Sequence, residues 1–275
     1  MTIREAGLAG GDSQRNALVL EAADARVVVG PQDGGRLVSV IVAGHELLVT
    51  DRDGGPIRWG AYPMAPWAGR VRHGRFSFAG REHQLPLGMP PHAIHGVVYD
   101  RPWRLLDAAT IAIDLDARWP FPGTVTQRFA LDEDGLEVTM TIEAERPMPV
   151  TMGWHPWFRR VLEPGDIPVS LDFAADEMLV RDAEGMPTGR RVAPSSGPWD
   201  DAFTGIRREP VLVWPGRLAL ELSSSCAWWV VYSEPEQSIC VEPQSGPPDA
   251  LNGGADIVSP GSPLAHVMRW HWTRG

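Results

Sequence analysis

Residues 136–144 read Leu-Glu-Val-Thr-Met-Thr-Ile-Glu-Ala, and apolar and polar side chains alternate through the whole stretch. A period of two residues predicts a β-strand with one buried face and one exposed face. Residues 124–131 precede it, and the two segments are joined by Asp132-Glu133-Asp134-Gly135, a sequence typical of a tight turn. The sequence therefore predicts an antiparallel hairpin in the middle of the chain.

Short segments of the same kind recur on both sides of this hairpin. We predict further strands at 26–29, 37–42, 75–78, 169–173, 218–222 and 228–232. The 275 residues include 29 glycines and 26 prolines, which favour many short strands joined by turns, and no stretch keeps a helical period. These patterns predict an all-β fold, an antiparallel sandwich or barrel, in one domain over residues 1–275.

The charged residues exclude several classes of function. All 25 basic residues are arginine, so chemistry that depends on lysine, such as Schiff-base formation or a phosphate-binding P-loop, is excluded. The net charge of −10, without a basic cluster, argues against nucleic acid as a partner and disfavours anionic membranes. Nothing in the sequence predicts an oligomeric state.

Cysteine content and hydropathy predict a cytoplasmic protein. Residues 1–30 lack the apolar core of a signal peptide, and the longest apolar run, 226–232, is far too short to span a membrane. The two cysteines, Cys226 and Cys240, make a disulfide scaffold unexpected and fit a reducing compartment, although they could pair if neighbouring strands align them.

Four segments place titratable side chains among glycine, proline and tryptophan, where a cleft can form: residues 63–72, 92–96, 153–158 and 241–252. Histidine exchanges protons near neutral pH, and a nearby carboxylate such as Glu242 supplies the complementary acid or base. The chain also has 12 tryptophans, whose flat faces pack well against sugar rings. These features predict acid–base chemistry and a carbohydrate ligand.

Five blocks in the same order resemble the aldose 1-epimerases, also called galactose mutarotases. They are Pro66-Trp67-Ala68-Gly69-Arg70, His92-Ala93-Ile94-His95-Gly96, Trp154-His155-Pro156-Trp157-Phe158, Trp199-Asp200-Asp201-Ala202-Phe203, and Val241-Glu242-Pro243 with the following Gly246-Pro247-Pro248-Asp249-Ala250. Two positions depart from the family pattern, because Gly69 stands where the family has asparagine and Trp157 where it usually has tyrosine. The resemblance implies a large antiparallel β-sandwich.

The resemblance also implies a reaction and the residues that perform it. The protein would be an isomerase that interconverts the α and β anomers of a hexose or related sugar, with no cofactor and no metal. Glu242 would act as general base on the anomeric hydroxyl, and His155 as general acid on the ring oxygen. Arg70 and His95 would stabilise charge near the ring oxygen, and Asp200 would accept hydrogen bonds from sugar hydroxyls.

Several residues have alternative interpretations. Trp157, Trp67 and Trp154 are candidates to line the cleft, whereas His92 is expected to be structural. Asp201 competes with Asp200 for the sugar-binding role.

Other functions also remain open. A non-catalytic sugar-binding or sensing protein is one alternative, favoured by the departures at positions 69 and 157. An epimerase of sugar phosphates or sulfonated sugars is a second, for which Arg72, Arg159 and Arg160 could supply the cationic pocket. A third is a cupin-like metal site formed by His92, His95, His155 and Glu242, although the spacing of three between His92 and His95 does not suit a strand. A glycosidase using Glu242 and Asp200 is a fourth.

Overall fold

The structure, a computed structural model, describes residues 2–5 and 17–275. In these residues the chain forms β-strands and three short 3₁₀ turns, Pro31–Asp33, Arg72–Gly74 and Ala250–Asn252, and no α-helix. No helix in this part of the chain is long and apolar enough to cross a membrane. The prediction of an all-β fold is confirmed.

The predicted central hairpin is present. Strands β13 (Gly123–Leu131) and β14 (Gly135–Ala144) pair antiparallel, and Leu131 faces Leu136 next to the turn. The even-numbered residues from 136 to 144 are all buried, so the period of two reflects one face packed in the core. The other predicted strands are also found, in β3 (Ala25–Gly30), β4 (Arg36–Val42), β8 (Arg75–Phe78), β20 (Leu218–Ser224), β21 (Trp228–Tyr232) and the first residues of β17 (Ser170–Arg181).

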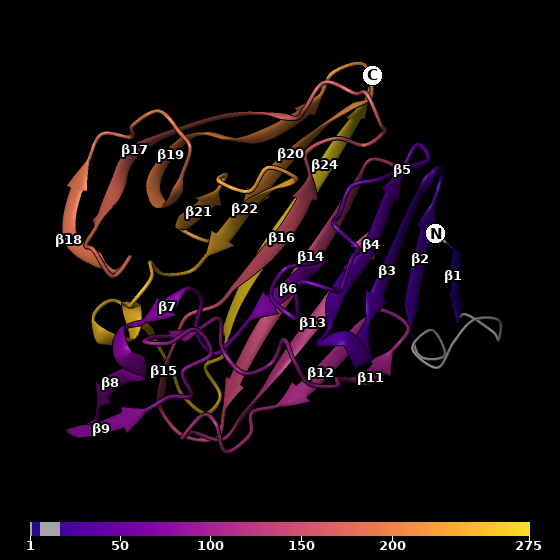
Figure 1. Cartoon of the computed structure of the whole chain (residues 1–275). Coiled ribbons are helices and arrows are strands. Elements are labelled where there is room, and N and C mark those ends of the chain that lie inside the picture. The colour runs from indigo at the N-terminus through magenta and orange to yellow at the C-terminus, as the bar shows by residue number, and fades with distance from the viewer. Residues whose placement is uncertain (1, 6–16) are drawn as a thin grey trace.

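Eighteen strands form one continuous antiparallel sheet, whose two arms face each other across the core (Figure 1). The first arm contains β1 (Thr2–Glu5), β2 (Leu18–Ala22), β3 (Ala25–Gly30), β4 (Arg36–Val42), β6 (Ala61–Met64), β16 (Gly153–Arg159), β22 (Ser238–Gln244) and β21 (Trp228–Tyr232), with β5 (His45–Glu46) beside β4. The second contains β19 (Asp200–Trp214), β20 (Leu218–Ser224), β24 (Leu264–Arg274), β14, β13, β12 (Thr110–Asp114) and β11 (Arg104–Asp107).

The long strand β19 connects the two arms. Its first residues pair with β21 and its last residues with β20, so it belongs to both arms in turn. Its other edge pairs with β17 (Ser170–Arg181), which in turn pairs with β18 (Pro187–Val192). Across the core, Nε1 of Trp154 on β16 donates to Oε1 of Gln127 on β13 at 3.1 Å, which joins the two arms directly.

A group of small ladders lies at the end of the sandwich where β17 and β18 project (left in Figure 1). They are β7 (Arg70–Val71) with β10 (Ala93–Ile94), β8 (Arg75–Phe78) with β9 (Arg81–Gln84), and β15 (Met148–Val150) with β23 (Asp256–Val258). Arg72, next to β7, pairs with Asp182 at 2.6 Å and Glu184 at 2.9 Å in the β17–β18 turn. These ion pairs hold the projecting hairpin against the small ladders.

The two cysteines are free and buried. The possibility that neighbouring strands would align Cys226 with Cys240 is therefore not realised.

Candidate functional site

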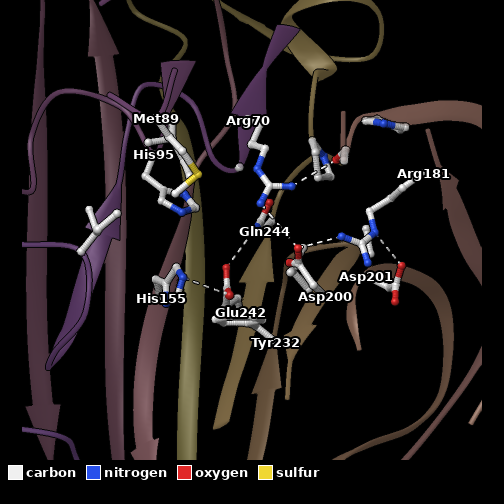
Figure 2. A pocket seen from close by; sticks show the side chains of 18 of the residues that line it. Arg70, Met89, His95, His155, Arg181, Asp200, Asp201, Tyr232, Glu242 and Gln244 are labelled. Atoms are coloured by element: carbon white, nitrogen blue, oxygen red, sulfur yellow. Dashed lines mark hydrogen bonds and ion pairs between the residues drawn. The ribbon is translucent and has the colours of Figure 1, made fainter. Parts of the chain in front are cut away.

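A pocket of about 300 Å³ opens on the first arm of the sheet (Figure 2). Strands β6, β16, β22, β21 and β19 lie side by side there and contribute its floor. All six site residues predicted from the sequence line it: Arg70, His95, His155, Trp157, Asp200 and Glu242. The fold therefore brings together residues that are up to 172 positions apart, counted from Arg70 to Glu242.

The centre of the pocket is a buried histidine–glutamate pair. In the β16–β22 ladder Trp157 faces Cys240, so His155 and Glu242, each two residues away along its strand, point to the same side of the sheet. Nε2 of His155 lies 3.2 Å from Oε1 of Glu242, and their side chains are only 7% and 2% exposed. Nε2 of Gln244 donates to the other carboxyl oxygen, Oε2, at 3.1 Å.

Burial determines where the proton of this pair resides. It raises the pKa of the Glu242 carboxyl well above its usual range, and the charge of Asp200 adds to the rise. Burial also lowers the pKa of the His155 imidazole to about 3. Both shifts favour the uncharged forms, so the proton shared by the pair resides preferentially on Glu242, which donates it to His155.

Aromatic rings fix the orientation of His155. Its imidazole stacks between Tyr62, at a centroid distance of 4.8 Å, and Trp157, at 5.3 Å. Behind Tyr62 lies the buried guanidinium of Arg36, 5.3 Å from the ring centroid, which donates to three backbone carbonyls at 2.6–3.0 Å. Burial lowers the pKa of Arg36 to about 10, so it remains charged at neutral pH, and this charge helps to keep His155 neutral.

The two blocks that carry Arg70 and His95 form one small ladder. Strand β7 pairs with β10, so that Arg70 faces Ile94, and the backbone N–H of His95 donates to the carbonyl of Gly69 at 3.0 Å. Burial lowers the pKa of His95 well below its usual value, with smaller contributions from His155 and Arg70, so its ring is also neutral.

The substitution at position 69 has a conformational explanation. Gly69 has a φ of +66°, in the left-handed region that glycine adopts freely and asparagine tolerates better than most residues. A Cβ atom at this position would lie 3.2–3.3 Å from Pro248. Glycine therefore adopts this left-handed turn freely and avoids a tight contact with Pro248.

Gly96 allows the loop that carries His95 to pack against the backbone of Ala65. Its φ is +80°, and a Cβ atom there would overlap the Ala65 carbonyl group. We expect Gly96→Ala to lower the free energy of unfolding by about 3 kcal/mol or more, because left-handed strain of about 1–3 kcal/mol adds to a backbone clash. Gly44→Ala is the matched control, since Gly44 has a φ of +82° with open space around it, and should cost only the strain. Urea unfolding of both variants measures the difference, and equal losses would contradict the packing argument.

A network of arginine and aspartate forms the side of the pocket beyond Glu242 (Figure 2). Nη1 of Arg181 donates to Oδ2 of Asp200 at 2.7 Å, and its Nε donates to Oδ1 of Asp201 at 3.0 Å. Nη2 of Arg70 lies 3.5 Å from the same Oδ2 of Asp200, while its Nη1 donates to the Gly185 carbonyl at 3.1 Å. Both aspartates therefore line the pocket, and only Asp200 joins the two arginines.

Several buried polar atoms of the pocket have no hydrogen-bond partner among the residues that the structure describes. They are Tyr62 Oη, His95 Nδ1, His155 Nδ1, Trp157 Nε1 and Gln244 Oε1. Buried polar groups in folded proteins are nearly always hydrogen-bonded, so such a concentration in one pocket suits a ligand with many hydroxyl groups.

Two tryptophans expected in the cleft lie elsewhere. Trp154 precedes His155 on β16 and therefore points to the opposite side, where it is 1% exposed in the core. Trp67 is also 1% exposed and packs on Trp119 at a centroid distance of 5.7 Å. Trp157 alone of the three candidates lines the pocket.

His92 has the structural role expected of it. Its Nδ1 accepts the backbone N–H of His73 at 3.1 Å, and its Nε2 lies 3.2 Å from the carbonyl oxygen of Glu184. The cupin-like set is therefore not assembled, because His92 is bonded away from the pocket. Within the described chain, the close group of metal-type donors is His155, Cys240 and Glu242, whose donor atoms lie within 4.8 Å of one another.

The arginines considered for an anionic substrate lie outside the pocket lining. Arg72 pairs with the β17–β18 turn, and Arg160 donates to the backbone carbonyls of Ser233 and Pro235. Arg159 is not among the lining residues either. The arginines that do line the pocket are Arg58, Arg70 and Arg181.

Sequence reasoning missed several pocket residues that contact the predicted ones, among them Tyr62, Arg181 and Gln244. Gln244 could have been found, because it lies two residues after Glu242 and so shares its face of a strand. Tyr62 directly precedes residues 63–72, the first of the four segments singled out in the sequence. No local signal marks Arg181, which reaches the pocket through the pairing of β17 with β19.

Comparison with known proteins identifies a family for this chain. The family model for aldose 1-epimerase matches residues 16–271. The uncharacterized protein YihR of Escherichia coli (strain K12) is 24% identical over 224 residues, 71% of this chain and 72% of that protein. Galactose mutarotase of Mus musculus is 27% identical over 141 residues, 47% of this chain and 41% of the mouse protein.

A solved structure shares the fold. The galactose mutarotase-like protein from Clostridium acetobutylicum superposes with a TM-score of 0.81 at 16% identity, covering 94% of this chain and 95% of that one. The family model spans nearly all of the sequence, including the five blocks that supply the pocket. The protein belongs to the aldose 1-epimerase family.

Proposed function

We propose that the protein is an aldose 1-epimerase that interconverts the α and β anomers of a hexose or related sugar. The observation that carries this proposal is the buried His155–Glu242 pair, 3.2 Å apart, on the floor of a pocket with many unpaired polar atoms. Family membership supports the same reaction.

The proton count of the pair matches the reaction. Ring opening removes a proton from the anomeric hydroxyl and adds one to the ring oxygen. When the single proton of the pair passes from Glu242 to His155, the carboxylate becomes the base and the imidazolium becomes the acid. Glu242 then takes the anomeric proton while His155 protonates the ring oxygen, and the C1–O5 bond breaks to leave an aldehyde.

After ring opening the pair again holds one proton, now on Glu242. Rotation about the C1–C2 bond presents the other face of the aldehyde, and the reverse transfers close the ring to the other anomer. Arg70 and His95 stabilise charge that develops at the ring oxygen, and Asp200 accepts hydrogen bonds from hydroxyl groups.

Anomer exchange tests this proposal directly. Polarimetry on freshly dissolved α-glucose and α-galactose, together with exchange NMR at equilibrium, should show faster interconversion with the protein than with buffer or heat-denatured protein. Binding without faster exchange across a panel of sugars would instead establish the non-catalytic alternative.

The pH dependence of the rate provides a second check. The His155 imidazole gains a second proton only as the pH approaches its pKa of about 3. We therefore expect kcat/KM not to fall as the pH is lowered from about 7 to about 5, the range in which an ordinary histidine becomes protonated. A rate that falls tenfold per pH unit below about 6.5 would show that His155 titrates normally.

A further inference from the structure

The order of strands in the sheet determines which part of a bound sugar approaches Asp200. His155 lies on β16, Glu242 on β22 and Asp200 on β19, and these strands follow one another across the sheet, with β21 between the last two. Glu242 therefore lies between His155 and Asp200 (Figure 2). In the proposed reaction the ring oxygen is at His155 and the anomeric hydroxyl at Glu242. C5 and C6 then lie on the His155 side, whereas C2 and C3, on the other side of C1, approach Asp200.

Asp200 offers one carboxyl oxygen to a hydroxyl group on that side. Its side chain is 24% exposed and lines the pocket. Oδ2 accepts from Nη1 of Arg181 at 2.7 Å, whereas Oδ1 has no hydrogen-bond partner among the residues that the structure describes. A carboxylate oxygen is a strong acceptor, so Oδ1 suits the hydroxyl group on C2 or C3.

Arg181 is the residue that holds this carboxylate in place. Its Nε donates to Oδ1 of Asp201 at 3.0 Å, so the planar guanidinium is fixed between two neighbouring carboxylates. Arg70 makes a longer contact with Asp200, 3.5 Å from its Nη2, and its Nη1 is bonded to the carbonyl oxygen of Gly185. The two arginines and the two aspartates balance in charge, and the shorter bond to Asp200 comes from Arg181.

We propose that Arg181 is a positioning residue, which holds Asp200 so that its other oxygen accepts a hydrogen bond from the 2- or 3-hydroxyl of the sugar. This contact keeps C2 and C3 in place while the aldehyde turns about the C1–C2 bond after ring opening. The inference rests on the proposed function, because that reaction sets the orientation of the sugar. It adds a residue that contacts neither the ring oxygen nor the anomeric hydroxyl.

Arg181→Met tests the proposal with glucose and its deoxy analogues. Methionine keeps much of the apolar part of the side chain but cannot donate to Asp200. We expect kcat/KM for glucose relative to at least one of 2-deoxyglucose and 3-deoxyglucose to fall about tenfold, the usual effect of losing a hydrogen bond to a charged group. The ratio of glucose to 6-deoxyglucose should not change, because the 6-hydroxyl lies on the His155 side.

Two further variants separate this role from a structural one. Arg208→Met is the matched control, because Arg208 pairs with Asp172 at 2.8 Å between the same strands, β17 and β19, outside the pocket lining. It should leave all three ratios unchanged. Asp200→Ala removes the acceptor itself and should lower the same ratio as Arg181→Met. Adding Arg181→Met to Asp200→Ala should lower that ratio no further, because Arg181 acts through Asp200.

The proposal is overturned if Arg181→Met lowers kcat/KM equally for glucose and for all three deoxy sugars, which is the result expected of a purely structural role. It is also overturned if the losses in the Arg181 and Asp200 variants multiply. NMR titration with the same four sugars measures binding apart from catalysis. If the wild-type protein exchanges no anomers, the proposed function fails, and the ratios of the dissociation constants test the role of Arg181 in the same way.

Discussion

Glu242→Gln should reduce kcat/KM for anomer exchange by about 10²–10⁴-fold, the usual contribution of a positioned general acid or base. Glutamine keeps the length of the side chain and its contacts with His155 and Gln244, but its amide neither accepts nor releases a proton in the reaction. Sugar binding should persist, so the loss should appear in kcat more than in KM. Exchange NMR measures kcat, and titration with the sugar measures binding.

The same variant should be at least as stable as the wild-type protein at pH 7. The pKa of Glu242 is raised in the folded state, so between its unfolded value and that raised value the folded protein holds a proton that the unfolded chain releases. Stability from this residue is thus present at low pH and declines as pH rises above about 4.5. Glutamine does not titrate, so the variant lacks this loss of stability with rising pH. The free energy of unfolding of the variant relative to wild type should therefore increase with pH.

Glu137→Gln serves as the control for the chemical change. Glu137 is 42% exposed and pairs with Arg269 on the far side of the sandwich, so its substitution should alter neither exchange nor its pH dependence. If Glu242→Gln exchanged anomers within tenfold of the wild-type rate while folding normally, Glu242 would not be the base.

The central hairpin was predictable because one of its faces is buried and the other is exposed. Strands β16 and β22, which carry the acid–base pair, lack that contrast. Nearly every residue in both is buried, so neither shows a period of two, and neither was predicted as a strand. Burial on both faces is also what makes these strands the floor of the pocket and shifts the pKa values of His155 and Glu242.

The candidate site was predictable to the extent that its residues lie in local motifs. His95, His155 and Glu242 each lie in a short block, and the resemblance assigns them to one cleft. Arg181 has no such block, because its position depends on the register between β17 and β19, a long-range pairing. The charge balance of the pocket therefore could not be predicted, and Arg72, Arg159 and Arg160 were considered in place of the arginines that line it.

His155→Asn should also lower the exchange rate by about 10²–10⁴-fold, because asparagine cannot protonate the ring oxygen. Its side chain is shorter than histidine and loses the stacking with Tyr62 and Trp157, so unfolding in urea must accompany the kinetics. His155→Gln is the second variant, since its amide nitrogen reaches farther toward Glu242. Both variants should lose exchange even if only one keeps the wild-type stability.

Combining His155→Asn with Glu242→Gln distinguishes a catalytic pair from two independent residues. If the two side chains pass one proton between them, removing either stops the same step, and the double variant should exchange little more slowly than the slower single variant. Independent contributions would instead multiply, giving a double variant about 10⁴–10⁸-fold below wild type, to the extent that the uncatalysed rate allows. Because the two atoms lie 3.2 Å apart and both side chains are buried, we expect the non-additive result. If the rate reductions of the two single variants multiplied in the double variant, His155 and Glu242 would act on the sugar independently.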